Sequence, residues 1–446
     1  MTTLARPDNP SRPAVLTRPG LAERAYVILT AFLLLYSLPN EWFVATVSGG
    51  TGNAAVNESQ GALPTVIFAG LFAVALVQLS GNWHLVRQLA RAEPLLPLFI
   101  ALAPLSVLWS ADPNVTARRS IAYALTSMFG YYLVVRFDLK EILRLTGVAM
   151  MAGTLLNIAF VQALPQYGIA ESTSSIDAGA WTGITTTKNS LGAVTVLSIV
   201  VFLVLARADR RHRVIYYGFA LLNAYIVINA NSKTAYLNMF LLSGLLVVYM
   251  LFRSRKTLFG AVAFAMLGAA AIAFAFVTTN IGVLAERLDR DITLSGRVPL
   301  WEDLLTEVGR SPMLGQGWSA YWNGFDSPSH EIWIQHPWLP PHAHNAFLDY
   351  ALQIGIIGLL LFSLLLIRSI IRGTRHIRDN PGPLPLFPLT MFSLTMLASI
   401  TESGIIGRRM VWALFVVCVL TVTRDSRDAI RSRQAEEDLA TTPGRG

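Results

Sequence analysis

The sequence predicts an all-α, polytopic integral membrane protein of about 12 transmembrane helices, with one large extracytoplasmic loop. Of its 446 residues, 53% are hydrophobic and 14% are charged, whereas an ordinary soluble chain carries about 25% charged residues. Apolar runs recur from residue 25 to residue 423, which is typical of helical membrane proteins. The net charge of +8 is attributed to basic connections on the cytoplasmic side, and no nucleic-acid partner is expected.

Residues 1–23 precede the first apolar run and are rich in proline and arginine. Because the apolar run behind them has no small-residue cleavage site, we expect a disordered cytoplasmic tail and no cleaved secretory signal. The single cysteine, Cys418, lies within an apolar run. It therefore supplies neither a disulfide framework nor a cysteine metal site.

The expected spans form two groups, helices 1 to 9 within 24–278 and helices 10 to 12 within 345–423. A bilayer core requires about 20 apolar residues per helix, and prolines such as Pro97 and Pro104 are tolerated there. In chain order the expected spans are 24–39, 64–80, 95–110, 120–136, 142–164, 190–206, 214–230, 235–252, 258–278, 345–367, 385–401 and 409–423.

Charge divides the connections between these spans into two sets. The basic set comprises 207–213, 253–256, 368–378 and the C-terminal segment 424–446. The set poorer in lysine and arginine comprises 40–63, 165–189 and 279–344. Since basic residues accumulate on the cytoplasmic side, we expect both termini in the cytoplasm, with 424–446 as a second tail, and 279–344 outside.

The loop 279–344 is much longer than the other connections, and long ordered loops are usually functional. Apolar residues at helical spacing predict a helix within it, with Pro299 in its first turn and Gly309 and Pro312 at its end. Its buried face is expected to hold Trp301, Leu304, Leu305 and Val308. Further tryptophans follow at 318, 322, 333 and 338. Such aromatics anchor a loop at lipid headgroups or stack on sugar rings.

His344 and Asn345 stand where this loop enters the tenth span, and Gly355 and Gly358 follow inside it. One interpretation is a histidine that caps the helix, with glycines that allow close helix packing. A second is a metal site, although no carboxylate spacing matches it. Its histidines would be His330, His336, His342 and His344.

Three further stretches carry cations at the outer face. In "NANSKTAYL" (229–237) a tight turn interrupts a long apolar run and places Lys233 at membrane depth. A lysine there either extends its ammonium group to the membrane surface or has a functional role. In "LSGRVPLW" Arg297 stands in the first turn of the loop helix, where free amides and the helix dipole favour an anion. The alternative is a solvated surface arginine. In "WTGITTTKNSLG" (181–192), Lys188 and Asn189 begin the sixth span.

These residues come from distant parts of the chain but share the outer face. Lys188, Lys233, Arg297 and His344 together suggest an anionic lipid headgroup with a base beside it. The same face is expected to hold Arg118, Arg119, Glu402, Arg408 and Arg409.

The pattern resembles the bacterial O-antigen ligase/polymerase superfamily, particularly its exopolysaccharide-polymerase branch. The resemblance rests on His-Asn-x9-Gly-x-x-Gly at 344–358 and the large loop before it. Supporting stretches are "SGRVPLW", "SKTA", "TGITTTKN", "PMLGQGW" and "ITESG". The resemblance covers most of the chain, roughly residues 100 to 425.

The resemblance implies an all-helical glycosyltransferase that moves a glycan from an undecaprenyl-pyrophosphate donor to a sugar hydroxyl, without cofactor or essential metal. It implies that His344 activates the acceptor and that Arg297 contacts pyrophosphate. Lys233 stands where ligases have arginine in a Ser-Arg pair. Because lysine cannot form the bidentate phosphate fork, that departure favours the polymerase branch. Lys188 is expected to assist at the pyrophosphate, with Asn345, Asn189, Glu402 and Arg408 in support.

The expected function is therefore a polysaccharide polymerase of the bacterial cytoplasmic membrane, with its active site on the extracytoplasmic face. The alternatives are a ligase acting on a lipid or protein acceptor, and a transporter of lipid-linked oligosaccharides, although the internal repeats common in transporters are not evident. Expected partners are the lipid-linked donor, an acceptor glycan and the bilayer. A chain-length regulator or a flippase is a further candidate partner.

Reporter fusions test this topology directly. Fusions after residue 255 and at the C-terminus should report cytoplasm, and fusions between 310 and 335 should report the outside, because of the lysine and arginine asymmetry between alternate connections. A cytoplasmic signal from 310–335 would separate the loop cations and His344 from any extracytoplasmic substrate.

Overall fold

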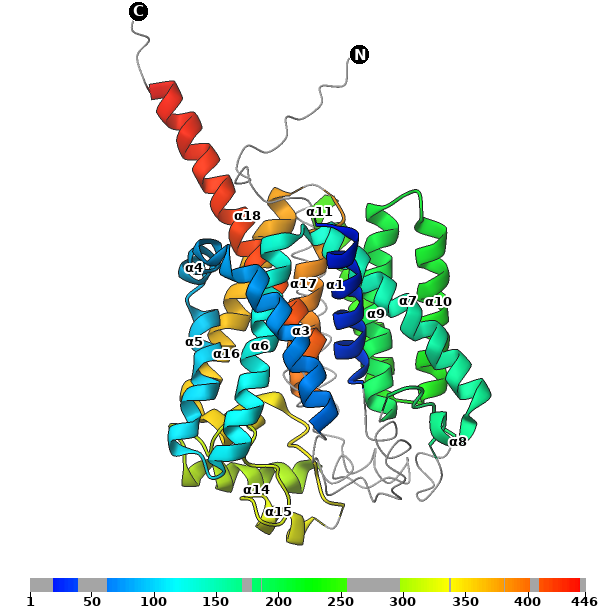
Figure 1. Ribbon diagram of the computed structural model, residues 1–446, viewed down its shortest axis with the longest axis vertical. Coiled ribbons are helices and arrows are strands. Elements are labelled where there is room, and N and C mark those ends of the chain that lie inside the picture. The colour runs from blue at the N-terminus through cyan, green and yellow to red at the C-terminus, as the bar shows by residue number, and fades with distance from the viewer. Residues whose placement is uncertain are drawn as a thin grey trace, which may run out of the picture.

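The computed structural model describes residues 19–38, 62–170, 179–185, 187–254, 297–336, 338–380, 382–401 and 409–441. Within these ranges the chain is built of helices, with one isolated bridge between extended residues, Ile169 and Trp181. The prediction of an all-α protein is confirmed. The long helices run side by side as one bundle with two distinct ends (Figure 1).

The long apolar helices occur where apolar runs predicted them. The helices before the loop are α1 (Leu21–Tyr36), α3 (Ala62–Ser80), α4 (Trp83–Ala92), α5 (Leu95–Leu105) with the 3-10 turn η1 (Ser106–Trp109), α6 (Pro113–Arg136), α7 (Leu139–Ala163), α8 (Pro165–Gly168), α9 (Lys188–Ala208), α10 (Arg213–Ala230) and α11 (Lys233–Ser254). The loop contributes α14 (Arg297–Arg310) and α15 (His330–Gln335), and after it come α16 (Ala346–Asp379), α17 (Leu386–Thr401) and α18 (Arg409–Thr441). Of these helices, α4, α8 and α15 were not predicted. The expected span 258–278 lies outside the described residues.

Four described helices are both long and apolar enough to cross a bilayer, namely α7, α9, α10 and α16. The pair α3 and α4 would supply a fifth as a broken span, with its two parts meeting at 91°. α5 with η1, and α17, are apolar but shorter. The helices therefore fit a polytopic membrane protein, while the total of about 12 spans stays a prediction.

Two basic segments that were expected outside the spans are helical. α16 continues to Asp379, so the arginines at 368–378 lie on its last turns rather than in a connection. α18 likewise continues to Thr441 and takes in most of the expected 424–446 tail. Arginine is a good helix former, and Arg368 and Arg372 also pair with Glu93, whose side chain is buried. A run of basic residues therefore indicates an end of the bundle, but the helix continues through that run.

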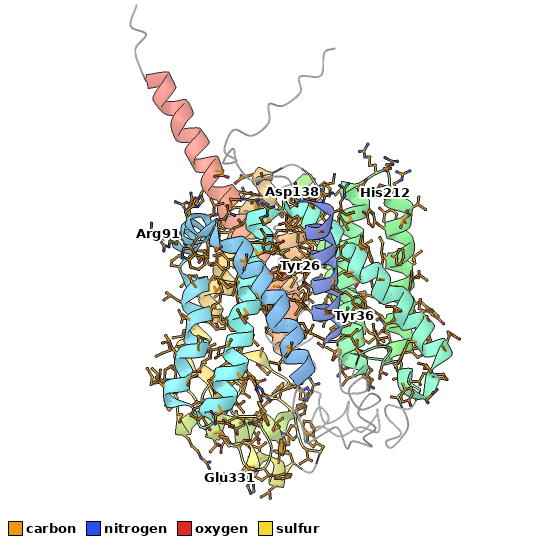
Figure 2. All side chains as sticks on the ribbon, viewed as in Figure 1. Tyr26, Tyr36, Arg91, Asp138, His212 and Glu331 are labelled. Carbon is orange, nitrogen blue, oxygen red and sulfur yellow. The ribbon has the colours of Figure 1, made fainter. Side chains whose placement is uncertain are left out.

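The bundle has a basic end and a loop end. The basic end, which includes α4 and the connection between α9 and α10, carries the labelled residues Arg91, Asp138 and His212 (Figure 2). The loop end carries α8, α14 and α15, and the labelled residue Glu331 (Figures 1 and 2). Because neighbouring helices alternate in direction, α9, α11 and α16 all begin at the loop end.

The loop is fixed to the bundle at a break in α16. Ile354 and Gly355 have non-helical backbone angles, so the helix loses part of its own hydrogen-bond ladder there. The loop segment 312–317 replaces those bonds. The amide of Ile356 donates to the carbonyl of Pro312 at 2.8 Å, and the amides of Gln316 and Gly317 donate to Leu352 and Gln353, each also at 2.8 Å.

The glycines of the His-Asn-x9-Gly-x-x-Gly pattern serve this break and not the packing of two helices, which corrects the sequence interpretation. Gly355 has φ +65°, and a Cβ there would lie 2.2 Å from the carbonyl oxygen of Met313. A Cβ on Gly358 would lie 2.2 Å from the displaced side chain of Ile354. On the loop side, a Cβ on Gly315 would lie 2.5 Å from the backbone of Gln353.

An aromatic cluster completes the attachment. The ring of Trp318, directly after the 312–317 segment, is 2% exposed and lies 4.5 Å from the ring of Tyr123 on α6. Tyr123 in turn lies 5.1 Å from Trp412 on α18. The amide of Trp318 donates to the hydroxyl of Ser106, and Arg119 donates to the carbonyl of Ser319 at 2.9 Å. The loop therefore packs as part of the bundle core.

Gly355→Ala should destabilise the protein strongly, because alanine must adopt a backbone region that costs about 1–3 kcal/mol and must also displace Met313. Gly218→Ala on α10 is the matched control, since a Cβ there meets nothing within 4 Å. Thermal unfolding in detergent, followed by intrinsic fluorescence, measures both. Equal midpoints for the two variants would contradict the role given to Gly355.

Candidate functional site

Two helices begin side by side at the loop end, and each begins with a lysine. Lys188 is the first residue of α9 and Lys233 is the first residue of α11. The hydroxyl of Ser232 donates to the Asn189 side-chain oxygen at 2.8 Å and accepts from the amide of Ala235 at 3.3 Å. One side-chain hydrogen bond therefore joins the starts of α9 and α11. We call these two helix starts the helix-start pair, and it comprises Lys188, Asn189, Ser232 and Lys233.

The helix-start pair combines two lysine ammonium groups with the positive ends of two helix dipoles. Anions bind favourably at such helix N-termini. A Cβ on Gly192 would lie 2.6 Å from the Cβ of Ala235, which shows how closely the two helices approach. Lys188 is half-buried and Lys233 is exposed. Lys233 thus stands at the end of the bundle, not enclosed within it, and the expected depth in the membrane stays a prediction.

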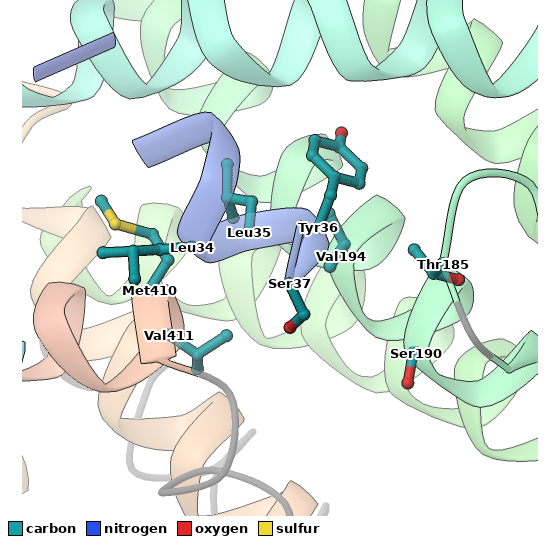
Figure 3. A pocket seen from close by; sticks show the side chains of 9 residues that line it. All are labelled: Leu34, Leu35, Tyr36, Ser37, Thr185, Ser190, Val194, Met410 and Val411. Atoms are coloured by element: carbon teal, nitrogen blue, oxygen red, sulfur yellow. The ribbon is translucent and has the colours of Figure 1, made fainter. Parts of the chain in front are cut away.

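A pocket is lined by Ser190, the residue after Asn189 on α9 (Figure 3). Polar hydroxyl groups line part of it, from Ser37, Thr185 and Ser190. Apolar side chains line the rest, from Leu34, Leu35, Val194, Met410 and Val411, together with Tyr36. The sequence did not predict this pocket, because it is assembled from α1, α9 and α18, which are far apart along the chain.

The second part of the site is the segment that leads into α16. Asn345 is the N-cap of α16, and its side-chain oxygen accepts from the amides of Phe347 at 3.0 Å and Leu348 at 3.2 Å. Asparagine is among the best N-cap residues because its side chain satisfies amides that have no intrahelical partner. The capping role therefore belongs to Asn345, which differs from the interpretation of His344 as the cap.

Three side chains hold this segment in place. The indole of Trp301 on α14 donates to the carbonyl of Ala343 at 2.8 Å. The Asp349 carboxylate accepts from the Ala343 amide at 3.4 Å and from the indole of Trp322 at 2.7 Å. Asp349 is 2% exposed. Asp349 was not predicted from the sequence, although an acidic residue inside an apolar run was a signal for it.

The imidazole of His344 lies near two other rings. Its centroid is 4.1 Å from that of His342 and 5.7 Å from that of Trp338. The backbone amide of His344 donates to Nδ1 of His342 at 3.2 Å, so that nitrogen carries no proton in this arrangement. His344 is half-buried and has φ +52°. His344 therefore has a backbone conformation that non-glycine residues adopt rarely.

The four candidate metal-binding histidines are not brought together. Nδ1 of His330 lies 2.6 Å from the Phe325 carbonyl oxygen, and Nε2 of His336 lies 2.8 Å from the Asp303 carboxylate. Within the described ranges, no three histidine, cysteine or acidic side chains are arranged to hold a metal ion. The metal interpretation therefore has no support from the described histidines.

Arg297 stands at the start of α14, as predicted, and is half-buried. It lies one turn before Trp301, so the two share a side of the helix. The expected buried face of α14 was partly wrong, because Leu305 is 63% exposed while Leu300, Leu304 and Glu307 are buried. The buried face of α14 is rotated relative to the expected one, and it packs on Tyr321, Ile332 and Ala343. Burial raises the pKa of the Glu307 carboxyl, and the ion pair with Arg310 opposes that shift.

The remaining outer-face residues differ in role. Arg119 holds the loop through Ser319 and is structural, whereas Arg118 is exposed near the same end. Arg409 begins α18. Glu402 and Arg408 lie outside the described residues, so their supporting role stays a prediction.

Comparison with known proteins relates part of the chain to a described family. Residues 218–363 match a family model described as O-Antigen ligase. This match supports the resemblance to the O-antigen ligase/polymerase superfamily. The chain is also similar to the "Exopolysaccharide production protein ExoQ" of Rhizobium meliloti (strain 1021), with 25% identity over 283 residues. That similarity covers 61% of this chain and 63% of the relative.

The O-antigen ligase match coincides with the parts of the site that the loop connects. It begins within α10 and ends in α16 after the break at Gly355. Lys233, Arg297 and His344 lie within it, together with the 312–317 segment. Lys188 and Asn189 lie outside the matched residues and belong to the site through their contact with Ser232.

Proposed function

We propose that the protein is a polysaccharide polymerase of the bacterial cytoplasmic membrane. It transfers glycan repeat units from an undecaprenyl-pyrophosphate donor to a sugar hydroxyl on the extracytoplasmic face. The observation that carries the proposal is the half-buried His344, held at the mouth of α16, at the same end of the bundle as the helix-start pair. The similarity to an exopolysaccharide production protein supports the choice of product class.

His344 is assigned the role of general base. A sugar hydroxyl is a poor nucleophile, and an imidazole can accept its proton as the new bond forms. In the proposed step the acceptor oxygen bonds to the anomeric carbon, the anomeric carbon–phosphate oxygen bond breaks, and the lipid pyrophosphate leaves. The acceptor proton passes to His344. A positioned general base contributes about 10²- to 10⁴-fold in rate.

The cations are assigned to the leaving group. Pyrophosphate gains charge as it departs, and fixed positive groups stabilise that charge. Lys188 and Lys233 would act with the two helix N-termini, and Arg297 would reach the pyrophosphate from the loop. The pocket beside Ser190 has an apolar lining suited to the first carbons of the lipid tail. No divalent ion is needed in this scheme.

A ligase is the second candidate, because the matched family is described as O-Antigen ligase. It would use the same donor site and pass the finished glycan to a lipid or protein acceptor. An assay with lipid-linked repeats as the only glycan distinguishes the two, since a polymerase lengthens them and a ligase leaves them at one length. No observation favours a transporter, since the described cations of the site gather at one end of the bundle rather than along a midplane path.

His344→Ala should abolish polymer while leaving the protein inserted and abundant, because it removes the proposed base without disturbing the Asn345 cap. Cells should then accumulate single lipid-linked repeats, measured by mass spectrometry of extracted lipids. Arg297→Lys should have an intermediate effect, since it keeps the charge but loses the planar fork.

His342→Ala is the control for this experiment, because it removes the neighbouring ring and keeps His344. Its effect on polymer should be milder than that of His344→Ala. Normal polymer from His344→Ala at normal protein level would show that His344 is not the base.

Polymerisation should survive chelation, because cationic side chains replace a metal in the proposed step. Purified protein supplied with lipid-pyrophosphate-linked repeats should lengthen them in EDTA at the rate seen without it. Loss of activity that a divalent ion restores would contradict the proposed leaving-group chemistry.

A further inference from the structure

Most tryptophans of the described loop are engaged in holding it together. The indole N–H groups of Trp301, Trp322 and Trp333 donate to Ala343, Asp349 and Pro340. The ring of Trp318 is buried in the aromatic cluster with Tyr123. Trp338 differs, because 43% of its surface is exposed. A ligand can therefore contact the exposed part of its ring.

Trp338 lies beside the proposed base. Its ring centroid is 5.7 Å from that of His344, with the two planes inclined at 42°. His342 is a second ring near His344, with its centroid at 4.1 Å. An acceptor group stacked on the indole would consequently have its edge next to the His344 imidazole.

The segment that carries these rings is fixed before any substrate binds. Leu339 and His344 both have positive φ, +49° and +52°. Non-glycine residues held in such backbone regions are costly and cluster at functional sites. The amide of Leu339 donates to His336 at 2.9 Å, and the indole of Trp333 donates to the Pro340 carbonyl at 2.9 Å. Together with the Trp301 bond to Ala343, these contacts fix Trp338 relative to His344.

An exposed tryptophan of a membrane protein has a second common role, as an anchor at the headgroups. Trp83 fits that role. It begins the amphipathic helix α4 at the basic end and is 42% exposed. Trp338 is exposed to the same degree, but it lies in a rigid loop segment next to two imidazoles. The setting, rather than the exposure, distinguishes the two.

We propose that Trp338 forms the subsite for the terminal pyranose of the acceptor glycan. A pyranose has an apolar C–H face that stacks on an indole and a rim of hydroxyl groups that stays free. Stacking on Trp338 would direct one rim hydroxyl to the imidazole of His344. Such positioning lowers the barrier by presenting the reacting groups in the right geometry. The assignment of the pyranose as acceptor rests on the proposed function.

The test measures acceptor kinetics for Trp338→Ala, Trp338→Phe and, as a matched exposed tryptophan, Trp83→Ala. The full-length protein in nanodiscs receives lipid-pyrophosphate-linked repeats as donor. The acceptor is the oligosaccharide released by mild acid from the same lipids. Trp338→Ala should raise the acceptor KM roughly tenfold with the donor KM unchanged, and Trp338→Phe should recover most of that loss. Trp83→Ala should match the unaltered protein.

An unchanged acceptor KM in Trp338→Ala would overturn the subsite. So would an equal rise in the acceptor KM in Trp83→Ala, since that result identifies a general loss of membrane anchoring rather than a subsite.

A binding experiment without donor separates failure of the subsite from failure of the proposed function. Calorimetric titration with the released oligosaccharide should show binding that Trp338→Ala weakens and Trp338→Phe retains. If this pattern holds and no glycan is transferred, the polymerase proposal fails and the subsite stands. If transfer occurs and Trp338→Ala binds the oligosaccharide normally, the subsite fails and the polymerase proposal stands.

Discussion

The arrangement of the loop end depends on an exchange of backbone hydrogen bonds at the break in α16. The helix opens at Ile354 and Gly355, and the segment 312–317 supplies the missing partners. Backbone groups left unpaired in an apolar environment cost several kcal/mol each. Detaching the loop would leave backbone groups of α16 at the break without hydrogen-bond partners. The approach of the two backbones is possible only because Gly315 and Gly355 have no Cβ.

This attachment explains how a long loop can contribute chemistry at a defined position. The 312–317 segment leads directly to Trp318 in the aromatic core, and Asp349 on α16 holds both Trp322 and Ala343. The His344 segment is therefore fixed from α14 and from α16 together. The helix-start pair at α9 and α11 forms a separate rigid element at the same end. A donor held by one element and an acceptor held by the other would meet at the loop end.

The sequence predicted the features that depend on local composition. Apolar run length located the long apolar helices, and the turn signals around Arg297 located α14. Features that depend on distant contacts were missed or misread. The role of Gly355 is one example, because the partner that requires a glycine is Met313, on a loop that precedes it. The pocket is a second example, since Leu34 and Met410 both line it and lie far apart along the chain. The shifted face of α14 reflects packing on Tyr321, which periodicity alone does not contain.

Amide hydrogen exchange in nanodiscs tests the central constraint most directly. The amides of Gln316, Gly317 and Ile356 should exchange as slowly as those in the middle of α9, because each donates to a carbonyl in the joined loop and helix. Peptides covering 312–318 and 354–358 would report these amides by mass spectrometry. Exchange at the rate of an unstructured peptide would show that the loop is not held by α16, and that His344 has no fixed position for catalysis.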